Sequence, residues 1–338
     1  MKILNEIKLN SYIPFLPKQI QKDVTSYNEV KNLLNQYDVC LMAHYYTPSH
    51  IQQLAQETGG FIGDSLEMAK KGAECSNKTL CIAGVRFMGE TSKILSPEKK
   101  VLLPNLQSEC TLDLHCNEEQ LIKIKQKYPE ALVVSYANTS ARIKALSDYV
   151  VTSSIAVKVI KHLKSLNKKI LWISDRNLGS YLSSVNDCAD FISWPGFCAI
   201  HDSFDLDALK SLKLKYPQAQ CVVHPESRGE IVKCADFVGS TSQIIKFCQA
   251  SASKSFIVVT ERNIEYALKQ NCPDKEFIVL PLQKDNPLGL KAQCPWMQLN
   301  TLDSIKDAIL NPQRHEVILD PQIMNQARHA LERMFDFI

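Results

Sequence analysis

The sequence has no marked excess of charge of either sign. Its 338 residues include 39 lysines and arginines and 36 aspartates and glutamates, which gives a formal net charge of +3. A dedicated nucleic-acid binder usually carries a concentrated stripe of lysine and arginine, and no such stripe is present. The balance of charge therefore argues against a nucleic-acid partner.

A long apolar run is also missing. No stretch approaches the ~20 apolar residues that a helix needs to span a bilayer. The first residues, MKILNEIKLNSYIPFLPKQ, mix charge and polarity, unlike the apolar core of a signal peptide. These absences predict a cytoplasmic protein that has no membrane partner.

The twelve cysteines include no CxxC pair. Disulfides are rare in the cytosol, so a metal-binding or catalytic role becomes more probable for some of these cysteines. Cys40, Cys81, Cys221 and Cys248 lie inside apolar runs, where a free cysteine is commonly a small buried hydrophobe. The spacing of the cysteines alone predicts no zinc site.

Most of the chain is an internal repeat. KYPEALVVSYANTS at 127–140 matches KYPQAQCVVHPESR at 215–228, and a more divergent copy contains YDVCLMAHYYTPS at 37–49. Such self-similarity indicates copies of one structural unit. We predict α/β units at 25–109, 110–197 and 198–293, after an N-terminal arm. The final segment, 294–338, is predicted to pack back on the first unit.

Each unit alternates short β-branched runs with helical patterns. ALVVSYA, DYVVTS, KILWIS and DFISWP are typical of buried parallel strands, whereas SSIAVKVIKHLKSL has apolar residues at helical spacing. This alternation predicts βαβ crossovers and a three-layer α/β/α sandwich with a parallel sheet in each unit. The fold class is therefore α/β, with three similar units around a pseudo-threefold axis.

The repeat aligns polar residues at the ends of predicted strands. These are His44, Tyr136 and His224, then Tyr46, Asn138 and Glu226 two residues later, and Ser65, Ser153 and Thr241 where the next helix is expected to open. Ligands of parallel α/β sheets bind beyond the carboxyl ends of the strands. A hydroxyl at a helix start is first of all an N-cap, but three converging helix N-termini would also bind anions.

A cysteine follows the last predicted strand of every unit. Cys110 stands in QSECTL, Cys198 in PGFCAIH and Cys294 in AQCPWM, and each comes after a strand that ends in proline. Equivalent cysteines would bring three thiolates to the pseudo-threefold axis. Three thiolates suit an iron–sulfur cluster with one open iron, or a zinc ion with three cysteine ligands.

Seven motifs, in order, resemble those of the quinolinate synthases, the iron–sulfur enzymes of NAD biosynthesis. They are AHYYTPSHIQQLA, GDSLEMAK, FMGETSKILSPEKKVLLP, YANTSARIKALSDYVVTSS, WPGFCAIH, HPES and CPWMQLNTL, and they cover about residues 37–310. The resemblance implies a [4Fe–4S] cluster at the pseudo-threefold axis, with Cys110, Cys198 and Cys294 as ligands and one open iron.

The resemblance also implies a reaction and a set of site residues. Family members condense iminoaspartate with dihydroxyacetone phosphate to quinolinate, losing phosphate and two waters, with the open iron as Lewis acid. Substrate contacts are expected from His44, Tyr46, Ser65, Tyr136, Asn138, Ser153, His201, His224, Glu226 and Thr241. We expect Glu226, a carboxylate beside a histidine in a dry pocket, to be the general base with a pKa tuned near neutrality, and Tyr46 to be a general acid or gate. The three histidines, His44, His201 and His224, would orient substrate or pass protons.

Two positions depart from the motifs of the family, and two functions other than quinolinate synthesis also fit the predicted cluster. Ile155 stands where family members usually have an asparagine, and Gly89 stands where they usually have an alanine. An iron–sulfur hydro-lyase acting on a related dicarboxylate, or a module that senses oxygen or iron, would also use such a cluster. A transient contact with the enzyme that makes the imine is a further expectation.

Overall fold

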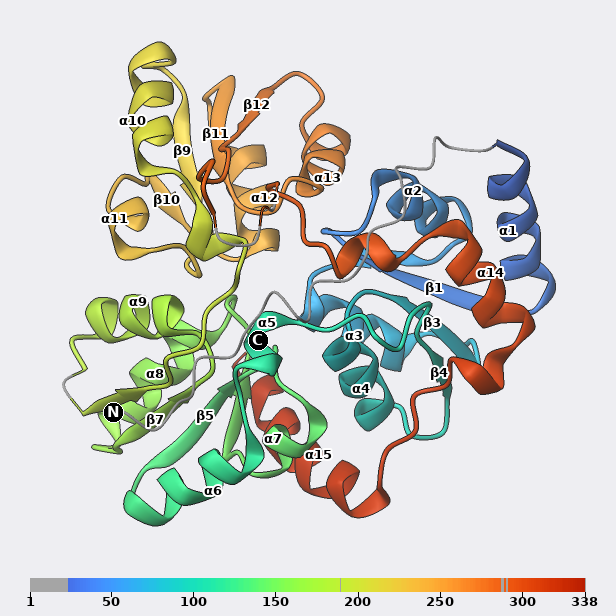
Figure 1. The fold of residues 1–338 in the computed structure, drawn as a ribbon, viewed down its shortest axis with the longest axis horizontal. Helices are drawn as coiled ribbons and strands as arrows, with labels where there is room; N and C mark the ends of the chain where they lie inside the picture. Colours follow the sequence, from blue (N-terminus) through green and yellow to red (C-terminus); the bar gives the residue numbers. More distant parts are fainter. Residues whose placement is uncertain (1–23, 189, 287–288, 290, 338) are drawn as a thin grey trace.

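The computed structural model describes residues 24–188, 190–286, 289 and 291–337, so residues 1–23 of the predicted N-terminal arm lie outside the described part. Figure 1 shows three α/β units around a common centre. The predicted fold class of three similar parallel α/β units is confirmed. The predicted boundaries between the units stay a prediction.

Each unit contains a four-stranded parallel sheet with the same topology. The strand orders are β2-β1-β3-β4, β6-β5-β7-β8 and β10-β9-β11-β12, so the first strand of each unit lies between its second and third. The strands are β1 (Val39–His44), β2 (Phe61–Gly63), β3 (Thr79–Ala83), β4 (Lys100–Leu102), β5 (Leu132–Tyr136), β6 (Tyr149–Val151), β7 (Ile170–Ile173), β8 (Phe191–Ser193), β9 (Gln220–Val223), β10 (Phe237–Val238), β11 (Ser255–Val259) and β12 (Glu276–Val279).

Helices connect the strands and cover the sheets. The first unit has α1 (Val24–Gln36), α2 (Ser49–Glu57), α3 (Ser65–Glu74) and α4 (Arg86–Leu95). The second has α5 (Thr111–Leu114), α6 (Glu118–Lys127), α7 (Ala141–Ala145), α8 (Ala156–Ser165) and α9 (Arg176–Asn186). The third has the 3₁₀ turn η2 (His201–Ser203), α10 (Leu206–Lys215), α11 (Gly229–Val232), α12 (Thr241–Ala250) and α13 (Ile264–Asn271).

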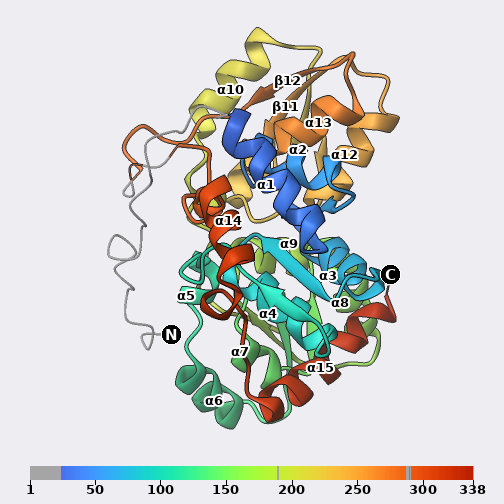
Figure 2. The same ribbon diagram turned by 90° about the vertical axis from the view of Figure 1, so that its right-hand side faces the viewer.

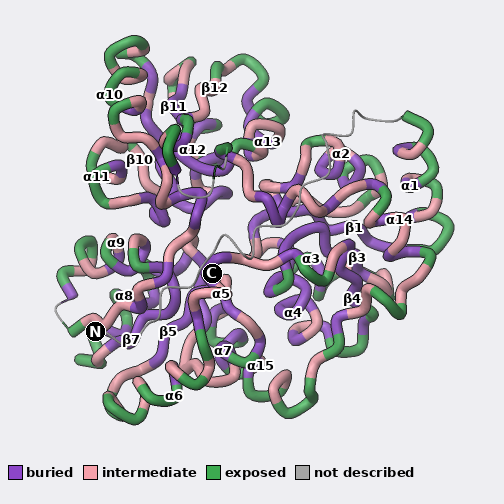
Figure 3. The backbone as a smooth tube through the Cα atoms, viewed as in Figure 1, coloured by how far each residue is buried: buried purple, intermediate pink, exposed green. Residues whose placement is uncertain are grey.

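Both faces of each sheet are buried, which explains why the strands are apolar runs. In β7, Ile170 and Trp172 belong to one hydrophobic cluster, whereas Leu171 and Ile173 belong to another on the opposite face. Successive side chains of a strand point to opposite faces, so the two clusters define two helix–sheet interfaces. Figure 3 shows this arrangement as buried strands inside exposed outer helices.

One predicted helix start is wrong. Ser65 and Thr241 open α3 and α12, but α8 begins only at Ala156, so Ser153 lies in the turn before it. Helices α3 and α12 begin at the predicted hydroxyl residues because the preceding residues, Asp64 and Ser240, form complete capping boxes. Before α8 the cap position is Ile155, which has no side-chain acceptor.

The C-terminal segment contacts two units. Its elements are η3 (Met297–Leu299), α14 (Leu302–Leu310), η4 (Pro312–Arg314) and α15 (Pro321–Phe335). The whole segment was predicted to pack on the first unit. Helix α14 does pack against α1 of that unit, but α15 packs mainly against α7 and β6 of the second unit (Figure 2). The reason is the apolar face of α15, where Ala327 and Leu331 join the core of the second unit. Among the described helices, none is long and apolar enough to cross a membrane.

Candidate active site

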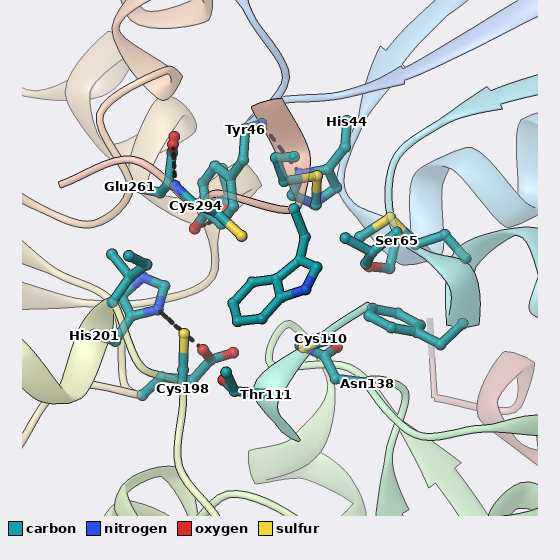
Figure 4. A pocket seen from close by; sticks show the side chains of 18 of the residues that line it. His44, Tyr46, Ser65, Cys110, Thr111, Asn138, Cys198, His201, Glu261 and Cys294 are labelled. Carbon is teal, nitrogen blue, oxygen red and sulfur yellow. Dashed lines mark hydrogen bonds and ion pairs between the residues drawn. The ribbon is translucent and has the colours of Figure 1, made fainter. Parts of the chain in front are cut away.

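A pocket lies where the carboxyl ends of the three sheets meet. Every residue predicted for the site lines it: His44, Tyr46, Ser65, Cys110, Tyr136, Asn138, Ser153, Cys198, His201, His224, Glu226, Thr241 and Cys294. Figure 4 shows the three cysteine sulfurs around the same space as His44, Tyr46 and His201. The structure therefore brings the predicted residues together in one pocket, and their roles stay a prediction.

The topology explains why residues so distant in sequence meet. Strand β1 ends at His44 and β5 at Tyr136, while His224 directly follows the last residue of β9. These three strands occupy the same position in their sheets. Since all strands of a sheet are parallel, equivalent strand ends converge when the three units face a common centre.

His44 and His224 form the same local turn. The backbone N–H of Tyr46 donates to Nδ1 of His44 at 3.1 Å, and that of Glu226 donates to Nδ1 of His224 at 3.4 Å. An Nδ1 that accepts a hydrogen bond belongs to a neutral imidazole with its proton on Nε2. Burial also lowers the pKa of both histidines to about 3. Both are therefore neutral at pH 7.

This burial predicts a pH-dependent stability. An unfolded histidine has a pKa of about 6.5, so the unfolded chain binds more protons than the folded one as the pH falls below that value. Stability is present above pH 6.5 and is lost as the pH falls toward 3. Between pH 7.5 and 5.5 the wild type should lose about 1.4 kcal/mol more unfolding free energy than His44→Gln. Urea unfolding at both pH values measures this difference, and equal losses would contradict it.

Glu226 is an acid of the pocket that contacts both a histidine and a tyrosine. Oε2 lies 3.0 Å from Nδ1 of His201, and Oε1 accepts a hydrogen bond from the Tyr136 hydroxyl at 2.6 Å. Burial raises the pKa of Glu226, but the electrostatic interactions with His224 and His201 and the hydrogen bonds with His201 and Tyr136 outweigh burial and lower it to about 2. We expected a pKa near neutrality. Instead, Glu226 is an ionised acceptor at pH 7.

A continuous hydrogen-bonded chain leads from Tyr46 to Glu226. The Tyr46 hydroxyl lies 2.8 Å from Thr241 Oγ1 and 2.6 Å from Thr260 Oγ1. Thr260 Oγ1 in turn lies 2.9 Å from Nε2 of His201, whose Nδ1 faces Glu226. With Glu226 ionised, one direction satisfies every partner: tyrosine donates to threonine, threonine to imidazole, and imidazole to carboxylate.

The three cysteines are half-buried and belong to three different loops. Burial raises the pKa of Cys110 and Cys198 well above the ordinary value, and that of Cys294 to about 12. Isolated thiolates are therefore unfavourable in this pocket, and a bound cation would stabilise them. The described cysteines predicted to be structural are buried in the cores: Cys40, Cys81, Cys221 and Cys248.

A second group could also hold a metal. The ligand atoms of Cys198, His201 and Glu226 lie within 4.8 Å of one another. The Cys198 Sγ is 3.2 Å from Nδ1 of His201 (Figure 4). Only one cysteine contributes to this group, which would leave the other two without a role in metal binding.

Sequence reasoning missed three polar residues of this region, although the repeat contains the signal. Thr260 joins the hydrogen-bonded chain, and Asp175 and Glu261 are fully buried carboxyls next to cysteine loops. SDRN at 174–177 and TERN at 260–263 occupy the same place in the repeat. Comparing those two tetrapeptides would have identified both acids.

The pocket has carboxylates but lacks long basic side chains. Glu109, Glu226, Glu261 and Asp64 line it, and no lysine or arginine is among its described lining residues. Because Asp64 and Ser240 serve as the caps, the hydroxyls of Ser65 and Thr241 are not needed for capping. Anionic ligands would therefore meet helix N-termini, hydroxyls and neutral imidazoles.

The family model described as NadA, quinolinate synthetase A protein, matches residues 28–336. The matched range contains the sheets of all three units, the three cysteine loops and both C-terminal helices.

Proposed function

Because the chain belongs to the quinolinate synthetase A family, we propose that it condenses iminoaspartate with dihydroxyacetone phosphate to quinolinate, with release of phosphate and two waters. The family implies a quinolinate synthase of NAD biosynthesis. The observation that carries the proposal is that one cysteine from each loop lines the same pocket as the strand-end histidines, tyrosines and Glu226.

The donor set fits an iron–sulfur cluster. We propose that Cys110, Cys198 and Cys294 hold a [4Fe–4S] cluster and leave one iron open, since thiolates are the ligands that such clusters prefer. When bound, the cluster supplies a Lewis acid for removing a hydroxide leaving group. A single metal ion on Cys198, His201 and Glu226 is the alternative. A ratio of bound iron to labile sulfide near one supports the cluster over the single ion.

The substrates carry two carboxylates and one phosphate, and the pocket would bind them without a basic side chain. The N-termini of α3 and α12 would direct their N–H groups and positive dipole ends at these anions. Ser65 and Thr241 would add hydroxyl donors from the first turns of those helices, and Asn138 an amide from the second unit.

Glu226 and Tyr46 are the proposed ends of the proton path. Glu226 would accept a proton from the substrate, because it is ionised and is held by Tyr136 and His201. Tyr46 would deliver a proton to a leaving oxygen. The proton that Glu226 accepts would return to Tyr46 after His201 changes to the Nε2–H tautomer and the chain through Thr260 reverses its direction. The neutral His44 and His224 would orient substrate as Nε2–H donors.

An anaerobic assay tests the proposed function. The purified protein, supplied with dihydroxyacetone phosphate and an enzymatic source of iminoaspartate, should form quinolinate detectable by mass spectrometry. Omission of dihydroxyacetone phosphate should abolish the product. A cluster-containing protein that forms no quinolinate, but dehydrates a hydroxy-dicarboxylate, would instead support the hydro-lyase. No turnover of either substrate would leave the sensing module as the explanation.

A further inference from the structure

Two buried carboxyls contact the cysteine loops at equivalent places in the repeat. Asp175 lies two residues beyond β7, and Glu261 lies two residues beyond β11, with exposed fractions of 0% and 1%. The backbone N–H of Cys198 donates to Oδ2 of Asp175 at 3.2 Å. The backbone N–H of Cys294 donates to Oε1 of Glu261 at 3.0 Å, as Figure 4 shows.

A backbone hydrogen bond accompanies each carboxyl contact. The N–H of Arg176, the residue after Asp175, donates to the Gly196 carbonyl at 2.7 Å. The N–H of Arg262, the residue after Glu261, donates to the Ala292 carbonyl at the same distance. Gly196 and Ala292 each stand two residues before a cysteine. Each of these two loops is therefore fixed at two points by its own sheet.

The first unit keeps the backbone contact but replaces the carboxyl. Arg86 donates its N–H to the Ser108 carbonyl at 2.6 Å, yet Val85 stands at the position of the acid. Ser108 lies two residues before Cys110, so the register is the same. A valine has no acceptor for the N–H of the cysteine.

The Cys110 loop contacts the other two loops as well as its own unit, where the Ser108 hydroxyl also lies 3.1 Å from the Gly84 carbonyl. The Ser108 hydroxyl donates to the Trp296 carbonyl at 2.7 Å, beside Cys294. The Thr111 hydroxyl donates a hydrogen bond to the Phe197 carbonyl at 3.2 Å and accepts one from the Ala199 N–H at 3.1 Å. Phe197 and Ala199 are the residues on either side of Cys198. Two loops are thus held by carboxyls, whereas the Cys110 loop combines contacts with its own unit and contacts with the other two loops.

We propose that Asp175 and Glu261 are positioning residues for the metal-binding cysteines, and that they set the Cys110 loop indirectly through Thr111 and Ser108. This inference rests on the proposed role of the three cysteines as cluster ligands. Removing either carboxyl acceptor should loosen one ligand loop directly and the Cys110 loop through it.

The second oxygen of each carboxyl makes an amide substitution informative. Asp175 Oδ1 accepts the N–H of Leu178 at 2.6 Å, and Glu261 Oε2 accepts the N–H of Asn263 at 2.6 Å. Asparagine or glutamine has the same size but only one acceptor oxygen. If that oxygen keeps the hydrogen bond from Leu178 or Asn263, the amide NH₂ faces the backbone N–H of the cysteine. Two donors then meet, and the hydrogen bond to the cysteine loop is lost.

The experiment measures iron release from anaerobically purified, cluster-loaded protein to a ferrous chelator, together with the EPR spectrum of the reduced cluster. Asp175→Asn and Glu261→Gln should each release iron about tenfold faster than wild type or more, with shifted g values. Asp205→Asn is the matched control. Asp205 also caps a helix, but both of its contacts use one oxygen and neither reaches a cysteine.

The outcomes separate this inference from the proposed function. A wild-type protein that binds no iron and sulfide would overturn the cluster proposal itself. A loaded wild type whose two amide variants keep its release rate and spectrum would overturn the positioning role. If an amide variant does not fold, the isosteric Thr111→Val tests the same network. Faster iron release from that variant supports the inference, and wild-type release contradicts it.

Discussion

Replacing Cys198 by alanine is expected to remove almost all bound iron and labile sulfide and to abolish quinolinate formation. Cys198 is one of three cysteines that line the pocket, and it comes from the loop that joins the second and third units. Two remaining thiols cannot complete the ligand set of a cluster that leaves one iron open. Iron and sulfide analysis after anaerobic purification measures the loss.

The fold itself should survive this substitution. Loss of one sulfur atom from a half-buried side chain costs about 1 kcal/mol, which a domain of ordinary stability tolerates. Cys234→Ala is the matched control, because Cys234 is a half-buried cysteine of the third unit whose thiol contacts the Glu230 carbonyl, outside the pocket. A Cys198→Ala protein with full iron and sulfide would contradict the ligand assignment.

Glu226→Gln is expected to lower kcat by a factor of about 10² to 10⁴ while the cluster stays in place. Glutamine keeps the volume of the side chain, and its amide oxygen can still accept the hydrogen bond from the Tyr136 hydroxyl. It cannot take a proton from substrate, and its amide NH₂ would face Nδ1 of His201, where the carboxylate now accepts. The measurement is the rate of quinolinate formation per cluster.

The control for this variant is Glu230→Gln, four residues away. Glu230 forms an exposed ion pair with Arg228 at 3.1 Å, so its loss should change activity little. A Glu226→Gln enzyme with a near-normal rate would exclude Glu226 as the base. Loss of iron from this variant would instead favour the single metal ion on Cys198, His201 and Glu226.

The sequence predicted that the site residues lie together because aligned copies of a repeat place equivalent residues at the same position of each structural unit. His44, Tyr136 and His224 were recognised as one strand-end position, and Cys110, Cys198 and Cys294 as one loop position. Parallel strands with the same order in each unit bring such positions to the same edge of each sheet. A periodic apolar pattern was enough to predict the parallel strands themselves.

Contacts between units could not be predicted in the same way. Tyr46 meets Thr260 although the two belong to different units and different repeat positions. That contact depends on how the first and third units are rotated against each other, and local pattern contains no information on rotation. For the same reason α15 was not predicted to pack on the second unit.

The chemical state of the site is likewise a property of the assembled structure. From sequence, Glu226 beside a histidine suggested a near-neutral base, whereas His201, His224 and Tyr136 together hold its pKa at about 2. These groups reach Glu226 only after folding. The sequence by itself determined the three-unit architecture and the strand-end, helix-start and cysteine positions that line the pocket, because these follow from the repeat. Only the tertiary structure decided the hydrogen-bonded chain and the carboxyl supports of the cysteine loops, because these depend on distances between side chains far apart in sequence.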